Sequence, residues 1–458
     1  MSNETIFVAQ AAFWMLVPLL VFLPIRWSLV AYLLLVQFDL TGLSSYSASS
    51  LGVENAIRVV AVPTVLLFRV GPIRPFPPAF ARMRQFWLLF TAYAGFAVLW
   101  SPYRLSGLKM FGYLYASCVL FVVFTAAWQN RCFTAKSLAV VVWFSLFFAL
   151  VQTYVLGNDF GDAVLGDRFT SFSGAQSFAP FLLSLFVLLL LCGSWKASSL
   201  VSAAAAAVGL VLTGSRSVFL GFTWALVIAG ILAAIRSGRR FSLSLLVKRA
   251  AFGGAAVVCI GLLVLNVLPD NRLNEMLAAV TTRNASLEDV GTFGWRYLLY
   301  EKEFDEIASR GFNRLFTGSG TSSGADFALE TSLYREENVD PNRAFHDEFL
   351  RSLYEWGLPG FLFLVLFLAE AVRICLRMVR QDGSHEALAF LAICLPLLIS
   401  LTVENTLAEA AGPAGVGYSL VLTCMVAAGC ARADKKRSPA FNNCPPLSGC
   451  QEAAATGS

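Results

Sequence analysis

The chain has 458 residues, of which 57% are hydrophobic and 14% are charged, and its mean hydropathy is +0.68. An ordinary soluble domain is about 45–50% apolar and about 25% charged, so the composition excludes a soluble globular protein and predicts one that crosses a membrane several times. The net charge of +5 is explained by basic residues in short loops, and no nucleic-acid partner is expected.

Apolar runs long enough to cross a hydrocarbon core of about 30 Å recur along the chain. The expected spans are 6–24, 28–43, 56–70, 86–101, 107–127, 137–157, 176–193, 198–213, 217–235, 250–268, 359–379, 387–403 and 413–431. The sequence therefore predicts an all-α fold, a polytopic transmembrane helical bundle of about 12–13 spans. A fused or re-entrant first pair would make the total even. The start lacks a basic region and a clear cleavage site, so we expect a retained helix and not a signal peptide.

Basic residues gather in four segments that fall on one side of the membrane if these spans hold. They are residues 69–84, 236–250, 373–380 and 432–437. Lysine and arginine in short loops mark the cytoplasmic side. We therefore expect a multi-span membrane domain over 1–432 and a disordered cytoplasmic tail over 433–458. Residues 269–358 form a long loop inserted in that domain on the opposite face, periplasmic in a cell with two membranes.

Cysteine placement adds no constraint on this loop. Ten cysteines are present, yet none lies between Cys259 and Cys375, so the loop carries no disulfide even though an oxidising compartment would permit one. The spacing of cysteine and histidine fits no zinc site. No metal ion or other cofactor is expected.

The long loop is expected to be partly helical. Residues 271–280 and 295–308 have apolar residues at helical spacing. The segment 316–327, rich in glycine and serine, lacks the GK[ST] ending of a phosphate-binding P-loop and is more typical of a flexible linker. A further helix is predicted to begin near Asn342 and to run through Trp356 into the "GLPG" that opens the next span.

Histidine is nearly absent from the chain, which directs attention to the end of the loop. His346 lies in "RAFHDEFLRSLYEWGLPG", whereas His385 falls on the cytoplasmic side, so the two cannot share a site. An imidazole with a pKa near 6.5 can accept a proton from a hydroxyl at neutral pH. His346 is therefore a candidate catalytic base, with Asp347 and Arg343 as candidates for orienting it. The alternative is a polar residue satisfied at the membrane boundary.

Three arginines on the same face are candidates for binding an anion. Arg216 interrupts two apolar stretches in "LVLTGSRSVFLGF", Arg296 begins an amphipathic helix, and Arg168 precedes a span. A charge at membrane depth is costly unless something anionic meets it, and guanidinium groups suit phosphate oxygens. They could hold a diphosphate leaving group while an imidazole activates an acceptor hydroxyl. Otherwise Arg216 snorkels to the interface and Arg296 lies on a solvated face.

These segments, in this order, resemble the O-antigen ligase/polymerase superfamily of bacterial inner-membrane glycosyltransferases. The resemblance covers roughly 160–430. It rests on "LTGSRSVFLGF", on "GWRYLLY", and on "FHDEFLRSLYEWGLPGF", which closes the loop. The last resembles the family's pattern of a histidine, a polar residue, a leucine and Gly-x-x-Gly. The second position is commonly asparagine in the family, so Asp347 departs from the pattern and puts the partner that orients the histidine in question.

The resemblance implies a metal-independent transferase that takes a glycan from undecaprenyl diphosphate on the periplasmic face of the inner membrane. By position, Arg216 and Arg296 match the family's diphosphate-binding arginines and His346 its proposed base, while Arg168 matches a frequent "RF" before a loop-to-helix turn. Expected partners are the lipid-linked glycan, an acceptor glycan or lipid A core, membrane lipid, and other components of polysaccharide export.

Three activities stay open at this point. A repeat-unit polymerase for exopolysaccharide or O-antigen is favoured slightly, because nothing in the loop advertises a specialised acceptor site. A ligase onto lipid A core would use the same motif. A transporter of lipid-linked glycan or solute is an alternative of another class. Against it, the polar residues gather in one external loop instead of at mid-span.

Overall fold

The computed structural model describes residues 3–38, 56–71, 78–130, 134–155, 175–192, 197–215, 292–324 and 347–382, with Phe169, Val218, Phe327 and Leu401. The regular elements in this part of the chain are all helical, which confirms the predicted all-α class. The helices of the first half are α1 (Asn3–Phe22), α2 (Ile25–Leu35), η1 (Ile57–Ala61), α4 (Val62–Arg69), α5 (Pro78–Ala97), η2 (Val98–Trp100), α6 (Arg104–Gln129), α7 (Ala135–Leu150) and η3 (Val151–Val155). They are followed by α8 (Ala175–Cys192), α9 (Ala197–Leu212), α13 (Thr292–Ser309), α14 (Phe312–Thr317) and α16 (Glu348–Asp382).

Three of these helical stretches are long and apolar enough to cross a membrane. They are Arg104–Ala127, Ala135–Val155 and Glu348–Ile374. Shorter apolar helices cover Phe13–Phe22, Ile25–Leu35, Ser177–Leu189 and Ala197–Leu212. Backbone N–H and C=O groups have no water to bond within lipid, so an apolar chain there satisfies them in helices. The expected spans 250–268 and 413–431 lie outside the described residues, as do 217–235 apart from Val218 and 387–403 apart from Leu401. The total of 12–13 spans therefore stays a prediction.

The second apolar segment forms a shorter helix than expected. A span was predicted over 28–43, but α2 ends at Leu35, after 11 residues. At 1.5 Å per residue this helix is only about 16 Å long, about half the hydrocarbon thickness. Two residues separate it from the end of α1, and it packs against that helix. The two helices are therefore separate elements of one hairpin, not a single fused span.

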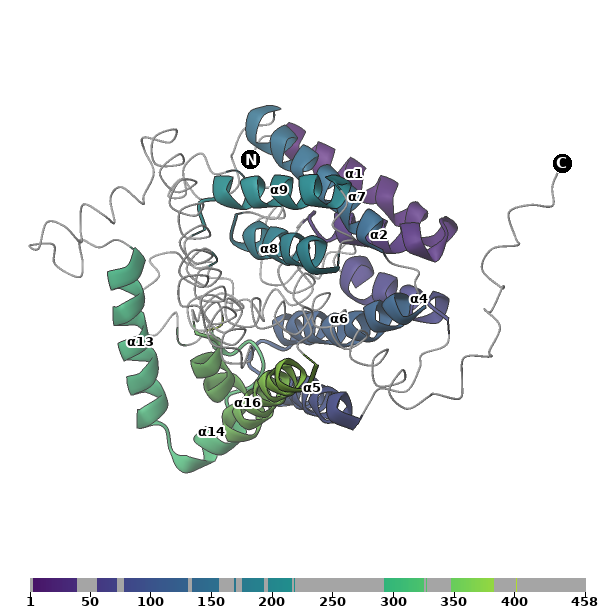
Figure 1. Ribbon diagram of the computed structural model, residues 1–458. Coiled ribbons are helices and arrows are strands. Elements are labelled where there is room, and N and C mark those ends of the chain that lie inside the picture. Colours follow the sequence, from purple (N-terminus) through teal and green to yellow (C-terminus); the bar gives the residue numbers. More distant parts are fainter. Residues whose placement is uncertain are drawn as a thin grey trace, which may run out of the picture.

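Two groups of helices make up the described bundle. In Figure 1, α8 and α9 lie together with α7, α1 and α2, while α5, α6 and α16 lie below them, and α13 runs crosswise to α6, α8 and α9. Gly209 of α9 allows one close approach, since a Cβ there would stand 3.1 Å from Leu182 of α8. Small residues at such contacts let membrane helices pack closely.

The packing of α5 against α16 positions the start of α16. Aromatic rings fill this interface: Trp87 lies 4.6 Å from Phe367 and Phe90 meets Trp356 edge-on at 5.0 Å, measured between ring centroids. Offset and edge-to-face pairs of this kind add to the stabilisation from burial alone. The start of α16 is therefore held against the end of α5.

Candidate functional site

The structure describes only part of the candidate site. His346, Arg343, Arg216 and Arg168 lie outside the described residues. Arg296 lies within α13, as the amphipathic pattern over 295–308 predicted, but its side chain is outside the described part. That these residues meet in space therefore stays a prediction. Asp347 and the residues around it are described, and they form the centre of the geometry that follows.

The break before Arg216 is a helix end. α9 stops at Leu212, and Gly214 follows with a positive φ of 62°. The Thr213 hydroxyl donates to the Leu210 carbonyl at 2.7 Å, and the Ser215 N–H donates to Thr213 Oγ1 at 3.4 Å. Glycine favours such a left-handed position at the end of a helix. The described part of the predicted interruption around Arg216 is confirmed, and it fixes where the chain leaves α9 just before Arg216.

Asp347 caps the first turn of α16. Its Oδ1 accepts the N–H groups of Phe349 at 2.8 Å and Leu350 at 2.9 Å. Aspartate and asparagine are both strong N-cap residues, because a short side-chain oxygen satisfies donors that the helix leaves unpaired. The described helix therefore begins at Glu348, and the stretch from Asn342 to His346, where the helix was expected to start, lies outside the described residues. The cap also accounts for an aspartate at a position where the resembling family commonly has asparagine.

The environment of this carboxyl affects its proton affinity. Burial raises the pKa of Asp347 above its ordinary value, while the backbone N–H groups of Leu350 and Phe349 act in the opposite direction. Burial dominates because a charged form loses hydration there. One carboxylate oxygen is thus engaged at the helix start, directly after His346 in the chain.

Ten residues after Asp347 the helix breaks at Gly357. This residue has φ 59° and ψ −165°, so two helices meet there, and Pro359 lies in the first turn of the second. A Cβ on Gly357 would stand 2.6 Å from the Gly318 nitrogen and would also overlap the Phe316 carbonyl oxygen. Only glycine combines a positive φ with this close approach of two backbones. The predicted change from a short helix to a span at "GLPG" is confirmed.

The glycine- and serine-rich turn packs into this break. Residues 318–324 are buried except for Ser319, and the N–H groups of Ser319 and Gly320 donate to the carbonyls of Tyr354 and Glu355 at 3.0 and 2.9 Å. The expectation of a flexible linker is therefore wrong for this part of 316–327. Glycines at 318 and 320, both with positive φ, allow the turn to lie directly against the end of the helix.

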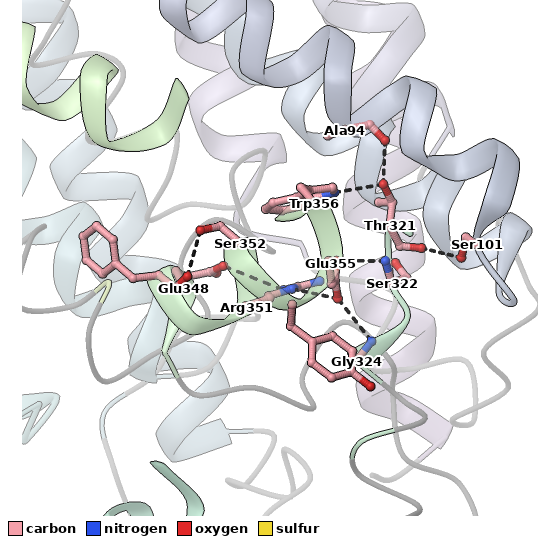
Figure 2. Close-up of polar contacts among 12 residues, drawn as sticks. Ala94, Ser101, Thr321, Ser322, Gly324, Glu348, Arg351, Ser352, Glu355 and Trp356 are labelled. Atoms are coloured by element: carbon pink, nitrogen blue, oxygen red, sulfur yellow. Dashed lines mark hydrogen bonds and ion pairs between the residues drawn. The ribbon is translucent and has the colours of Figure 1, made fainter. Parts of the chain in front are cut away.

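Glu355 binds this turn through its side chain. Its Oε2 accepts the Ser322 N–H at 2.8 Å, and its Oε1 accepts the Gly324 N–H at 3.3 Å (Figure 2). The same Oε1 receives the Arg351 Nε at 3.1 Å, and Arg351 Nη1 lies 4.0 Å from Glu348 Oε2. All three charged side chains are at most 1% exposed. A buried carboxylate of this kind needs its charge paired and its lone pairs satisfied, and the turn and Arg351 do both.

A second set of bonds joins the turn to α5. Trp356 Nε1 donates to Thr321 Oγ1 at 2.9 Å, and that hydroxyl donates to the Ala94 carbonyl at 2.5 Å. The Ser101 hydroxyl donates to the Thr321 carbonyl at 2.6 Å. Figure 2 shows these residues converging on Thr321, with the ribbon of α5 on one side and the start of α16 on the other. The turn is thus fixed to two helices far apart in the sequence.

Arg310 completes the connection to α13. Its guanidinium carbon lies 3.4 Å from the centroid of the Tyr354 ring, and Nη1 donates to Ser319 Oγ at 2.6 Å. Its Nε pairs with Glu306 at 3.3 Å. A guanidinium over an aromatic face combines electrostatic attraction with packing. The end of α13, the helix that carries Arg296, is therefore tied to the helix that starts beside His346.

Together these contacts form a brace, which we define as Arg310, Thr321, Arg351, Glu355 and Trp356 with the turn 318–324. The brace joins two segments that each carry a predicted site residue. The brace was not predicted from the sequence. One signal was available: Glu348, Arg351 and Glu355 lie at helical spacing in a chain that has few charges near its spans. In the described residues, no group of three or more His, Cys, Asp or Glu side chains is placed to hold a metal ion.

Comparison with known protein families finds a match within the chain. Residues 200–365 match the O-antigen ligase family, which confirms the resemblance drawn from the motifs. The matched segment contains the end of α9, α13, the turn 318–324 and the break at Gly357. It also contains five of the six candidate site residues, Arg168 being outside. No match was found among curated proteins.

Proposed function

Residues 200–365 match the O-antigen ligase family, and we propose that the chain belongs to the O-antigen ligase/polymerase superfamily of membrane glycosyltransferases. We propose further that it moves a glycan from undecaprenyl diphosphate to an acceptor hydroxyl on the periplasmic face of a bacterial inner membrane. The observation that carries the proposal is the family match over 200–365. It spans the Arg216 break, the Arg296 helix and the histidine motif in one continuous region.

The proposed chemistry needs one base and a site for the leaving group. His346 accepts the proton of the acceptor hydroxyl as its oxygen bonds to the anomeric carbon of the donor. The bond from that carbon to the diphosphate breaks, and undecaprenyl diphosphate leaves with the electron pair. Arg216 and Arg296, with Arg168 as a third candidate, bind the diphosphate and stabilise its growing negative charge. Asp347 and Arg343 orient the base, Asp347 by fixing where the helix starts.

The proposed arrangement of the chain follows the sequence analysis. Residues 1–432 form the membrane domain, residues 269–358 form a periplasmic loop within it that carries the site, and residues 433–458 form a cytoplasmic tail. The brace supports this assignment, because it fixes the loop helix α13 and the start of α16 to each other. A site assembled from separate segments needs such fixed geometry.

Within the family we favour a repeat-unit polymerase, which passes the growing glycan to another lipid-linked unit. A ligase passes it to a lipid A core with the same base and arginines. The two activities differ in the acceptor, so the intermediate that accumulates on loss of activity distinguishes them.

A deletion strain complemented with single variants tests the proposal. His346→Ala is expected to abolish long-chain glycan at a normal membrane level on immunoblot, whereas His385→Ala, which changes the other histidine, is expected to restore it. Accumulated single repeat units indicate a polymerase, and accumulated full-length lipid-linked chains indicate a ligase. Normal glycan from His346→Ala would overturn the assignment and favour a transporter, for which mid-span substitutions would be the damaging ones.

A further inference from the structure

Two aromatic side chains on the short helix α14 face away from the protein. Phe312 is 76% exposed and Phe316 is 48% exposed, and their stacked rings have centroids 6.3 Å apart. No residue of α14 is fully buried. Phenylalanine is among the residues most often buried in folded proteins, so an exposed pair on an ordered helix needs an apolar environment outside the chain.

The depth of α14 is set by its contact with the break in α16. The Phe316 carbonyl and the Gly318 nitrogen lie directly against Gly357, and the Tyr93 hydroxyl donates to the Thr317 carbonyl at 3.4 Å. The exposed apolar residues of α16 begin at the next position, with Leu358, Leu362 and Leu366 one helical turn apart. α14 therefore lies at the level where α16 enters the membrane, and Figure 1 shows it beside that end of α16.

Other aromatic residues mark the same level on α5 and η2. Phe96 is exposed and meets the Trp100 ring edge-on at 5.3 Å, and Tyr93 lies 6.3 Å from Trp100. Tryptophan and tyrosine concentrate at membrane–water interfaces, where an apolar ring body and a polar tip are both accommodated. Tyr93 connects this aromatic group to α14 through its bond to the Thr317 carbonyl, which supports a membrane boundary at the same level.

The neighbouring helix α13 has a different surface. Its exposed residues include the charged Glu301, Lys302 and Asp305 together with one aromatic residue, Phe304, while its buried face is turned toward the protein. Charged side chains of this kind require water or headgroups. Three of the four exposed residues within 301–305 are charged, whereas α14 exposes the stacked pair Phe312 and Phe316. The boundary between water and lipid therefore falls along this short stretch of chain.

We propose that α14 is an interfacial helix, with Phe312 and Phe316 inserted among the acyl chains of the leaflet on the side of the 269–358 loop. The exposed Arg314 lies at the level of the lipid phosphates. Short amphipathic segments with phenylalanine on one face and basic residues beside it bind bilayer surfaces in this way. The occupant of this surface is bulk phospholipid.

The lipid contact of α14 does not depend on the proposed function. What that contact means for the candidate site does rest on the proposed function. The nine residues between Asp347 and Gly357 make a helix about 14 Å long, so Asp347 lies at most that far from the boundary. The diphosphate of a membrane-anchored donor lies among the headgroups. Anchoring α14 thus keeps the start of α16 within reach of a donor that has not left the membrane.

Photo-crosslinking tests the contact. The photoreactive residue p-benzoylphenylalanine replaces Phe312 in the full-length protein, which is placed in nanodiscs of phosphatidylethanolamine and phosphatidylglycerol and irradiated. Asp305, exposed on the opposite side of α13 from its buried Glu303 and Ile307, is the matched control position. We expect phospholipid adducts by mass spectrometry with the probe at 312 and their loss with the probe at 305. A probe at Phe316 is expected to give the same adducts as at 312.

Each other outcome overturns the proposal. Equal lipid adducts at 305 and 312 would place the whole of α13 in the bilayer, and adducts at neither position would place α14 in water. Crosslinks from 312 to a second copy of the chain would show that protein covers the surface. All three positions are exposed, so elution as a single species by size exclusion checks the fold. Glycan transfer is not a readout, so failure of the proposed function would leave this result unchanged.

Discussion

At the scale of single residues, Asp347 can cap the helix as well as the asparagine that the resembling family commonly has at this position. A carboxylate oxygen and an amide oxygen can both accept the two N–H bonds at the start of α16. The residue after His346 in the sequence therefore stabilises the start of the helix.

Asp347→Ala is expected to destabilise the protein by about 0.5–2 kcal/mol through loss of the cap. Asp347→Asn, the matched control, keeps an acceptor and is expected to keep both stability and glycan transfer. Thermal unfolding of the purified protein in detergent measures the difference. Equal melting temperatures for the two variants would show that the cap does not stabilise the helix start.

The titration of Asp347 predicts a pH dependence. Burial raises its pKa in the folded protein, so the folded state binds the proton more tightly than the unfolded state does. Its contribution to stability is present at low pH and is lost as pH rises from the ordinary pKa through the raised one. The melting temperature of the wild type relative to Asp347→Asn is therefore expected to fall as pH rises through this window. A pH-independent difference between the two proteins would contradict this.

At the scale of elements, the contact between α14 and α16 depends on two backbones meeting. Gly357 has a positive φ and no room for a Cβ, because the Phe316 carbonyl and the Gly318 nitrogen occupy that space. Gly311, at the start of α14, has open space around the position of a Cβ and an ordinary φ of −61°.

Gly357→Ala is accordingly expected to separate the turn from α16, and Gly311→Ala is expected to be neutral. The first variant should melt well below the wild type and should be cut faster by protease within 312–324, since a locally opened segment is a better protease substrate. Equal protease resistance of the two variants would mean that the turn is not held by this contact.

The brace predicts an order among charge deletions. Arg351→Leu leaves Glu355 with two backbone donors, whereas Glu355→Leu removes the acceptor of the Ser322 and Gly324 N–H groups and leaves the buried Arg351 without its closest carboxylate. Breaking a buried pair from one side costs about 3–5 kcal/mol, and Glu355→Leu is expected to cost more than Arg351→Leu.

The double variant Arg351→Leu with Glu355→Leu is expected to lose less stability than the sum of the losses of the two single variants. In the double variant both charges of the pair are removed, so neither Arg351 nor Glu355 remains buried without the other. Melting temperatures of the three proteins give this coupling. Strict additivity would indicate that the ion pair does not link the two side chains energetically.

At the scale of the whole molecule, the sequence was sufficient for the helical class, for the resemblance to the family that residues 200–365 match, and for the chain breaks before Arg216 and at Gly357. These follow from hydropathy and from glycine placement, which are local signals. The start of α16, the burial of the turn 318–324 and the brace were not predicted. The start of α16 depends on a side-chain cap by Asp347, which hydrophobic periodicity does not register. The burial of the turn depends on partners more than 30 residues away along the chain, such as Glu355 for Ser322 and Ala94 for Thr321, and no periodicity records those distances.

The proposed orientation predicts the location of two segments. A reporter inserted within 330–340 is expected on the periplasmic side and one fused after 437 on the cytoplasmic side, because the basic clusters lie on the same side as the tail. Alkaline phosphatase activity for the loop and green fluorescence for the tail check this. Both reporters on one side would refute the assignment of the 269–358 loop.

The central claim is that the loop and the start of α16 transfer a glycan, with His346 as the base. The most direct measurement is transfer by purified protein in liposomes that contain lipid-diphosphate-linked glycan and an acceptor, compared between wild type, His346→Ala and His385→Ala. Loss of a general base lowers rates by roughly 10²–10⁴ fold, so we expect His346→Ala to fall by that order while His385→Ala stays at the wild-type rate. Equal rates for all three proteins would contradict the account.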